Sequence, residues 1–355
     1  MAVAVIPQRQ AASVQPGPPA RRTRASTRTL GLVGCAAAVA ILCFLSLAVG
    51  ARVTPLHAVW DALVAYDPTN TDHLVIRELR LPRTILGVLV GAALGLAGGV
   101  MQGVTRNPLA DPGILGVNAG AALFVVLGIS LLGVTSILGY VWFAFAGAAL
   151  ASVIVYSVAA LGREGATPVK LALSGAAISA AFGAVTSALL LLDQATFDQF
   201  RFWAVGSLAG RDMSVVQQIA PFLVLGCLLS LFLGRVLNTL SLGEDVARGL
   251  GANVLLSRGL SAGAVVLLCG AATAACGPIG FVGLTIPHVA RMIVGPDYRW
   301  VLPYAMVLSP ILLLSADIIG RVVARPGELQ VAIVTAFLGA PVFIALVRRK
   351  KLAEL

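Results

Sequence analysis

The sequence predicts an all-α integral membrane protein with about ten transmembrane helices and both termini in the cytoplasm. Of its 355 residues, 59% are hydrophobic and only 11% are charged, whereas soluble domains carry about 25% charged residues. The mean hydropathy is +0.96. The apolar residues fall into runs of about 20, which is the length that an α-helix needs to cross a bilayer.

Ten apolar runs follow one another along the chain, and polar or basic segments separate them. We place the spans at 30–49, 83–104, 113–132, 137–160, 170–192, 214–234, 258–276, 279–294, 302–320 and 329–347. The eighth span is short, follows Gly277-Pro278 and contains Pro287. It is either a full span or a broken, partly re-entrant helix that neighbouring protein covers.

The Lys and Arg residues orient the spans, because cytoplasmic loops carry an excess of basic residues. With the N-terminus inside, 17 of the 25 basic residues lie inside and 8 lie outside. Both termini are then cytoplasmic and the number of spans is even. The net charge of +10 therefore indicates topology rather than nucleic-acid binding, since the basic clusters are short and contain no interleaved aromatic residues.

Residues 1–29 are polar and rich in Pro, Ala and Arg, so we expect a disordered, basic cytoplasmic tail. Residues 30–350 form the ten-helix domain. The apolar run after the tail is about 20 residues long and shows no clear cleavage site, which argues against a signal peptide. The outer stretch 193–213 is amphipathic, and its aromatic residues are expected at the membrane interface.

Five glycines recur at every fourth position of the second span. They are Gly87, Gly91, Gly95, Gly99 and Gly103. At helical pitch they lie on one face, and small residues at this spacing let another helix approach closely. We expect this face to be a contact surface inside the membrane.

A proline-rich turn follows the glycine face. Pro108 disfavours a helical conformation at Asn107. Asp111 and Pro112 combine an N-cap residue with a proline at the first helical position. We therefore expect a tight turn on the inner side, with the third span starting directly after it.

The main inner loop, 235–257, has the signals of a short helix. Ser241 and Glu244 fit a capping box, Glu244 and Arg248 form an i,i+4 pair, and Gly249 and Gly251 end the helix. The helix is either a solvated connector or a docking element for a soluble partner.

Asp317 and Arg321 lie four residues apart near the outer end of the ninth span. An ionisable residue in a membrane segment is costly and usually has a partner. These two residues either pair with each other, or Arg321 is exposed and recruits an acidic partner. The other acidic residues are expected in loops, so no relay of intramembrane carboxylates is predicted.

The chain lacks the motifs of nucleotide binding and of hydrolytic catalysis. It contains no GxxxxGK[ST], HExxH or GxSxG pattern. The three histidines are too scattered for a metal site, and the five cysteines are expected to act as small buried hydrophobic residues. We expect no catalytic residue, no metal site and no cofactor bound by this chain.

The sequence resembles the FecCD/BtuC-type permeases, which are membrane subunits of type II ABC importers for iron–siderophore complexes, haem and vitamin B12. The resemblance covers about residues 30–350. Its motifs are Arg80-Leu81-Pro82-Arg83, the glycine face, Gln102-Gly103, Arg106-Asn107-Pro108-Leu109-Ala110-Asp111-Pro112, Leu115-Gly116-Val117, Leu173-Ser174-Gly175, Trp203-Ala204-Val205-Gly206-Ser207-Leu208, Leu242-Gly243-Glu244, Gly277-Pro278-Ile279-Gly280-Phe281-Val282-Gly283-Leu284, Pro287-His288 and Ala316-Asp317 with Arg321.

This resemblance implies a BtuC-like fold in the cytoplasmic membrane and the import of a ferric–siderophore-type chelate by alternating access. Vitamin B12 and haem are the alternative cargoes. An integral-membrane enzyme would need a convergent polar or metal site, which the sequence does not show. The implied partners are a second permease subunit, two ATPase subunits that bind Mg-ATP, an extracytoplasmic binding protein and membrane lipid; nucleic acid is not among them.

The resemblance also implies roles for individual residues. The binding protein would dock on Arg80, Arg83 and Arg321. The ATPase subunits would dock on Leu242, Gly243, Glu244, Asp245, Ala247, Arg248, Gly249, Leu250 and Gly251. The cytoplasmic gate would include Asn107, Leu109, Ala166 and Thr167. The glycine face would either pack within the subunit or line the transport path.

Overall fold

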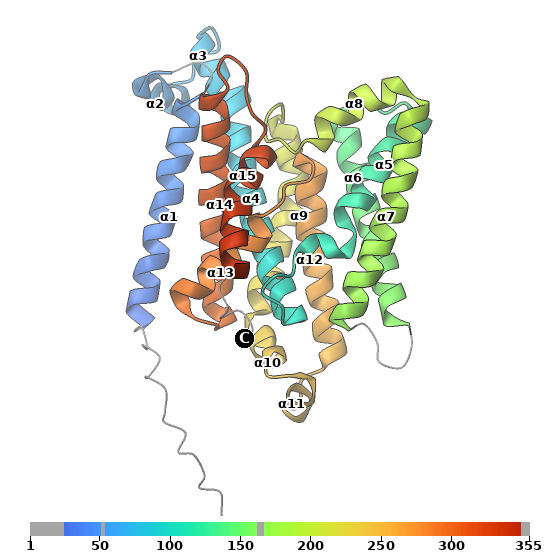
Figure 1. Ribbon diagram of the computed structural model, residues 1–355. Helices are drawn as coiled ribbons and strands as arrows, with labels where there is room; N and C mark the ends of the chain where they lie inside the picture. The colour runs from blue at the N-terminus through green and yellow to red at the C-terminus, as the bar shows by residue number, and fades with distance from the viewer. Residues whose placement is uncertain (1–24, 51–53, 162–166, 349–355) are drawn as a thin grey trace, which may run out of the picture.

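The computed structural model describes residues 25–50, 54–161 and 167–348, and every regular element in them is a helix (Figure 1). Seven helices are long and apolar enough to cross a membrane. They are α1 (Ala25–Ala48), α4 (Leu81–Thr105), α6 (Ile137–Ala160), α7 (Pro168–Leu192), α9 (Met213–Phe232), α12 (Val254–Cys276) and α14 (Tyr298–Val323). Three shorter apolar helices are α5 (Val117–Leu132), α13 (Val282–Val294) and α15 (Val331–Arg348). Each of the ten predicted runs thus contains a helix, which confirms the predicted fold class.

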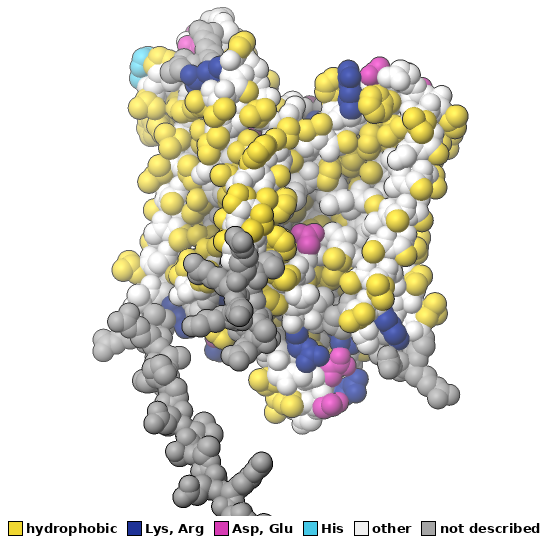
Figure 2. Space-filling model, in the orientation of Figure 1, with side chains coloured by type: hydrophobic (Ala, Val, Ile, Leu, Met, Phe, Trp, Pro, Cys, Tyr) yellow, Lys and Arg dark blue, Asp and Glu magenta, His cyan; other side chains and the backbone are white. Residues whose placement is uncertain are grey.

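Short helices close the two ends of the bundle (Figure 1). At one end, which we call the outer end, lie α2 (Leu56–Val64), α3 (Thr71–Leu74) and α8 (Gln194–Ala204). At the opposite end lie α10 (Gly234–Ser241) and α11 (Glu244–Gly249). The resemblance predicts ATPase docking there, and we call this end the coupling end. The start of α1 and the end of α15 both lie toward the coupling end, as an even number of spans requires. Figure 2 shows basic side chains at both ends and a largely apolar flank between them.

Three helix starts differ from the prediction. Helix α1 begins at Ala25, so residues 25–29 of the predicted tail are helical, and residues 1–24 lie outside the described residues. The helix of the second span begins before the predicted residue 83. Helix α3, the π-helical turn η1 (Val75–Arg80) and α4 form one continuous helix from Thr71 to Thr105. Asn70 caps this helix by accepting a hydrogen bond from the Asp72 amide.

The third span does not start at 113. Asp111 accepts a hydrogen bond from the Gly113 amide and caps a 3₁₀ turn, η2 (Pro112–Leu115), rather than an α-helix. Gly116 then takes a left-handed conformation with φ +73°, which interrupts the helix before α5 begins. The predicted proline start is therefore real, but it opens a separate short turn.

Of the two alternatives for the eighth predicted span, the structure has the shorter, broken helix. Helix α13 has 13 residues, which at 1.5 Å per residue is about 20 Å and too short to cross the bilayer core. Its first turn lies against α4, because a Cβ atom at Gly98 would meet the Gly283 carbonyl oxygen at 1.9 Å. Gln102 also donates hydrogen bonds to the carbonyls of Gly283 and Leu284. Protein therefore covers the start of α13, as a helix start within the membrane requires.

The amphipathic outer stretch forms α8. Phe200 and Trp203 are buried in the bundle, whereas Phe202 is exposed. Asp193 caps the helix by accepting hydrogen bonds from the amides of Ala195 and Thr196. The predicted amphipathic element is present, but Phe200 and Trp203 pack inside the bundle and not at the membrane interface.

The glycine face of α4 packs against α14 within the same chain. A Cβ atom at Gly87 would meet Leu314 at 2.7 Å, one at Gly91 would meet the Pro310 backbone at 2.8 Å, and one at Gly95 would meet Ser309 Oγ at 1.9 Å. Further along, Gly99 faces Leu302 and Gly103 faces Tyr298 and Leu237. Of the two alternatives for the glycine face, the structure has the packing surface.

Because α4 and α14 are in close contact, we expect a Gly→Ala substitution to be costly on the glycine face and tolerated where no helix lies opposite. Replacing Gly95 with Ala should lower the free energy of unfolding by about 1–3 kcal/mol, because the new methyl group overlaps Ser309 and the Ala305 carbonyl. The matched control is Gly34→Ala in α1, where nothing lies within 4 Å. Thermal unfolding of both purified variants in detergent tests this. Equal melting temperatures for the two variants would contradict the packing assignment.

Candidate functional site

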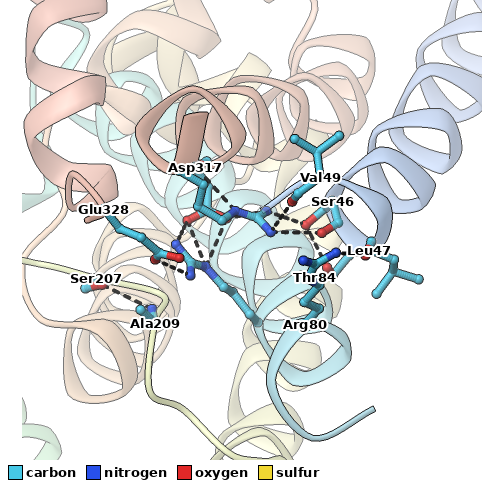
Figure 3. Close-up of polar contacts among 11 residues, drawn as sticks. Ser46, Leu47, Val49, Arg80, Thr84, Ser207, Ala209, Asp317 and Glu328 are labelled. Carbon is cyan, nitrogen blue, oxygen red and sulfur yellow. Dashed lines mark hydrogen bonds and ion pairs between the residues drawn. The ribbon is translucent and has the colours of Figure 1, made fainter. Parts of the chain in front are cut away.

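A buried ion cluster joins three helices at the outer end (Figure 3). Arg83 of α4 donates hydrogen bonds to Asp317 of α14, with Nη2 2.8 Å from Oδ1, and to Glu328, with Nη1 2.6 Å from Oε2. Arg321 pairs with the second carboxylate oxygen of Asp317 at 2.8 Å. Asp317 therefore lies between two guanidinium groups and balances part of the charge of both.

The C-terminal end of α1 supplies the remaining partners. Arg321 donates to the carbonyl oxygens of Ser46 and Val49, both at 2.9 Å. Arg80 donates to the carbonyl oxygens of Leu47 and Ala48 at 2.7 and 2.9 Å. Carbonyl groups in the last turn of a helix lack partners within the helix and carry partial negative charge. The two arginines therefore bind the end of α1 as well as α4 and α14.

Of the two alternatives for Asp317 and Arg321, the structure has the mutual pair, and Arg321 is not exposed. Only 1% of Arg321 is exposed, compared with 6% of Arg80 and 8% of Arg83. An unpaired charge in an apolar bundle is costly, so these side chains lie inward against anions and carbonyls. Glu328 is the part of the cluster that reaches the surface, with 34% of its side chain exposed. The sequence does not reveal it as a partner, because 245 residues separate it from Arg83.

The predicted turn at the inner end of α4 is present. Arg106 ends α4 in a left-handed conformation with φ 50°, and Asn107 Oδ1 accepts a hydrogen bond from the Leu109 amide at 2.9 Å. Thr167 caps α7 and so lies at that helix's start, while Ala166 lies outside the described residues. Helix α7 contacts η2 at Gly175, which lies about 12 Å along the helix from Thr167.

Asp111 is not in a loop outside the membrane. It shares a small cavity with Leu94 of α4 and with Cys269 and Thr273 of α12, well inside the two long helices. After Asn107 the chain turns back into the bundle before α5 starts, which carries this carboxylate inward. Nearby, Asn118 accepts a hydrogen bond from Thr273 at 3.0 Å. The prediction that Asp317 is the sole acidic residue of the membrane segment is therefore wrong.

Helix α10 is tied to the start of α14 at the coupling end. Asn238 Nδ2 donates to Asp297 Oδ1 at 2.6 Å, and Asn238 Oδ1 accepts from the Tyr298 amide at 2.8 Å. Hydrogen bonds from Arg299 and then from Asn238 lower the pKa of Asp297 to about 2. Asp297 is therefore ionised at neutral pH, and its carboxylate can accept the hydrogen bond from Asn238 that joins α10 to α14.

Helix α11 is tied to α12 by Glu244, which pairs with Arg258 and, at 3.5 Å, with Arg248. The i,i+4 pair is confirmed, but the capping box is wrong. Ser241 is the last residue of α10, where its hydroxyl donates to the Asn238 carbonyl. Gly243, with φ +104°, separates the two helices and so takes Ser241 out of reach of α11.

An apolar face of α11 and its flanks lies open at the coupling end. Leu242, Val246 and Leu250 are 60%, 50% and 66% exposed, whereas Ala247 is buried against the bundle. We call these three residues the coupling face. Helix α11 ends at Gly249, and Gly251 follows with φ +82°, as predicted. Contiguous exposed apolar residues indicate a contact with a protein or with the membrane.

Comparisons with known proteins agree on one family. The sequence profile of the FecCD transport family matches residues 38–349. The ferric enterobactin transport system permease protein FepD of Escherichia coli is 47% identical over 327 residues, which are 92% of this chain and 97% of FepD. The iron(3+)-hydroxamate import system permease protein FhuB of Bacillus subtilis is 41% identical over 330 residues, 92% of this chain and 86% of FhuB. A solved structure described as an inward-facing conformation of a metal-chelate type ABC transporter matches with a TM-score of 0.79 at 29% identity, over 91% of this chain and 99% of that chain.

The outer ion cluster predicts a large penalty for removing its central anion. Asp317→Asn should lower the free energy of unfolding by about 3–5 kcal/mol, because Arg83 and Arg321 lose a buried counter-charge. The matched control is Asp198→Asn, which breaks the exposed Arg201–Asp198 pair and should cost less than about 0.5 kcal/mol. Denaturant titration in detergent measures both. A loss for Asp317→Asn as small as that of the control would refute the structural role of the cluster.

Proposed function

The chain belongs to the FecCD transport family, and from this premise we propose that it is the permease subunit of an ABC importer in the cytoplasmic membrane. The cargo is a ferric chelate of the siderophore type, since FepD and FhuB are named for ferric enterobactin and iron(3+)-hydroxamate. The observation that carries the proposal is the coupling face, an exposed apolar surface on a short helix that lies beyond the ends of the long helices (Figure 1). A permease that is driven by separate ATPases needs such a surface.

In this proposal, two ATPase subunits bind and hydrolyse Mg-ATP and dock on residues 242–251. The contacts of α10 and α11 support this, because each of these short helices is held to a long one. Glu244 joins α11 to α12, and Asn238 joins α10 to α14. A displacement of the coupling face would therefore move both long helices. The partner must bind the two arrangements with different affinities for the displacement to drive transport.

Helices α4 and α14 would move as one unit during transport. The glycine face leaves no gap between them, and the outer ion cluster locks their outer ends together. A second permease subunit would complete the path, with Asn107, Leu109 and Thr167 at the cytoplasmic gate. The exposure of Leu109 at the inner turn supports this placement.

The outer end would receive the binding protein that delivers the chelate. Arg80, Arg83 and Arg321 are buried, so direct docking on all three would need the cluster to open. Arg83 is the arginine that a binding protein would reach most directly, because its partner Glu328 lies at the surface. An acidic side chain of the binding protein would displace Glu328 from Arg83.

Uptake by whole cells tests the function directly. The chain is expressed with its ATPase and binding-protein partners in a strain that lacks its own ferric-chelate permeases. Uptake of radiolabelled ferric enterobactin, ferric hydroxamate, ferric citrate, haem and cobalamin is then compared. We expect uptake of at least one ferric chelate, and its loss when the ATPase is inactivated. Uptake of haem or cobalamin without any ferric chelate would refute the proposed cargo.

The coupling face predicts a selective loss of ATPase binding. The double substitution Val246→Asp with Leu250→Asp should reduce co-purification of the ATPase at least about tenfold, because two charges would be desolvated in the contact. The control is Val64→Asp in α2, an exposed apolar residue at the outer end. Normal ATPase recovery with the double variant would show that the partner docks elsewhere.

The surface position of Glu328 predicts a gain of binding. Glu328→Gln frees Arg83 for a partner carboxylate, so the affinity for the binding protein should rise about two- to fivefold. The gain should shrink at high salt, because exposed charges are screened. Surface plasmon resonance measures both effects, with Glu78→Gln as the control of equal charge at the outer end. An unchanged or weaker affinity would count against docking through Arg83.

A further inference from the structure

A polar cavity of about 570 Å³ lies at the coupling end. The inner end of α4, the end of α13, the start of α14 and Ser241 at the end of α10 line it, and it is open to the surface. Its polar lining consists of Gln102, Thr105, Arg106, Asn107, Ser241, Arg291 and Tyr298. The cavity thus contains two arginines and no acidic side chain.

Arg291 is held in this cavity by neutral groups. One guanidinium nitrogen donates to Gln102 Oε1, and another donates to the Tyr298 hydroxyl oxygen at 3.4 Å. Gln102 is itself fixed, because its amide nitrogen donates to the carbonyls of Gly283 and Leu284. Arg291 Nε is buried without a hydrogen-bond partner. The side chain is therefore oriented but not neutralised.

Arg106 brings a second positive charge to the same cavity. Its left-handed backbone ends α4 and turns the side chain toward the junction of α10 and α11. There, Nη1 lies 3.7 Å from the position of a Cβ atom on Gly243. Within residues 25–50, 54–161 and 167–348, neither Arg106 nor Arg291 forms an ion pair with an Asp or Glu.

Other buried or partly buried arginines of this chain meet an anion or a carbonyl group. Arg83 and Arg321 share Asp317, Arg258 pairs with Glu244, and Arg211 donates to the Ala275 carbonyl at 2.6 Å. At the coupling end, the partly buried Arg291 departs from this pattern, and the exposed Arg106 lines the same cavity. Two guanidinium groups that line one cavity, with a tyrosine hydroxyl that can still donate its hydrogen, are suited to an oxyanion, which accepts several charge-assisted hydrogen bonds.

We propose that this cavity is a binding site for an oxyanion, a carboxylate or a phosphate group, held by Arg106, Arg291 and the Tyr298 hydroxyl. Two kinds of ligand could supply such an oxyanion at the inner end of an importer. One is an anionic ferric chelate that leaves the path past Asn107, and this source rests on the proposed function. The other is the phosphate of an anionic lipid headgroup. The site itself depends on neither source.

Calorimetry on the full chain in phosphatidylcholine nanodiscs tests the site, with citrate and inorganic phosphate as the probes. The wild type should bind at least one of them. Arg106→Gln with Arg291→Gln should weaken that binding about tenfold or more. Arg106→Gln alone, which leaves the Gln102–Arg291 contact intact, should weaken it measurably. The control is Arg201→Gln with Arg235→Gln, which removes the same charge at exposed positions outside the cavity and should leave binding unchanged.

Nanodiscs that contain phosphatidylglycerol separate the two sources. If the headgroup occupies the site, this lipid should compete with citrate, and native mass spectrometry should find it retained on the wild type and lost from the double cavity variant. If the chelate is the occupant, citrate binding should persist in the presence of the lipid. Arginine-independent binding of both probes, or no binding of either probe together with no retained lipid, would overturn the proposal. Because no step uses uptake or the ATPase, failure of the proposed function would leave these results unchanged.

Discussion

The close packing of α4 against α14 is the contact on which the rest of this structure depends. Five glycines remove every side chain from one face of α4, so the backbone of α14 lies against it along most of its length. In a bilayer, lipid tails are as apolar as the helices, and association relies on such close contact and on interhelical polar bonds. At the outer end, Arg83 of α4 pairs with Asp317 of α14, and at the coupling end the ring of Tyr298 in α14 packs against Gly103 of α4.

The arginines that line the two ends of the bundle fall into two kinds. At the outer end, Arg83 and Arg321 are matched by Asp317 and by the carbonyl groups that end α1. Such a cluster costs much in desolvation, and its value lies in holding α1, α4 and α14 in one register. At the coupling end, the exposed Arg106 and the partly buried Arg291 have no matching acid in the described part of the chain. A balanced cluster suits a structural joint, whereas an unbalanced one suits a site that binds an anion.

Local patterns in the sequence predict the elements well and their partners poorly. Apolar runs identify all ten helices, and Gly277-Pro278 with Pro287 marks α13 as the short one. The glycine spacing predicts a contact face, but it does not say that α14 fills it. The burial of Arg321 could not be predicted, because its partners at Ser46 and Val49 are more than 270 residues away in the sequence. Asp111 was misplaced because a proline turn does not reveal that the chain re-enters the bundle.

The central claim is that α14 and α10 move together as one rigid body when the coupling face is displaced. Double electron–electron resonance on the complex tests this most directly, with one spin label at Arg235 of α10 and another at Val323 of α14. A second pair joins Arg235 to Leu191 of α7. Between the nucleotide-free and ATP-bound complexes, the account predicts an unchanged Arg235–Val323 distance and a changed Arg235–Leu191 distance. A shift of the Arg235–Val323 distance as large as that of the second pair would contradict it.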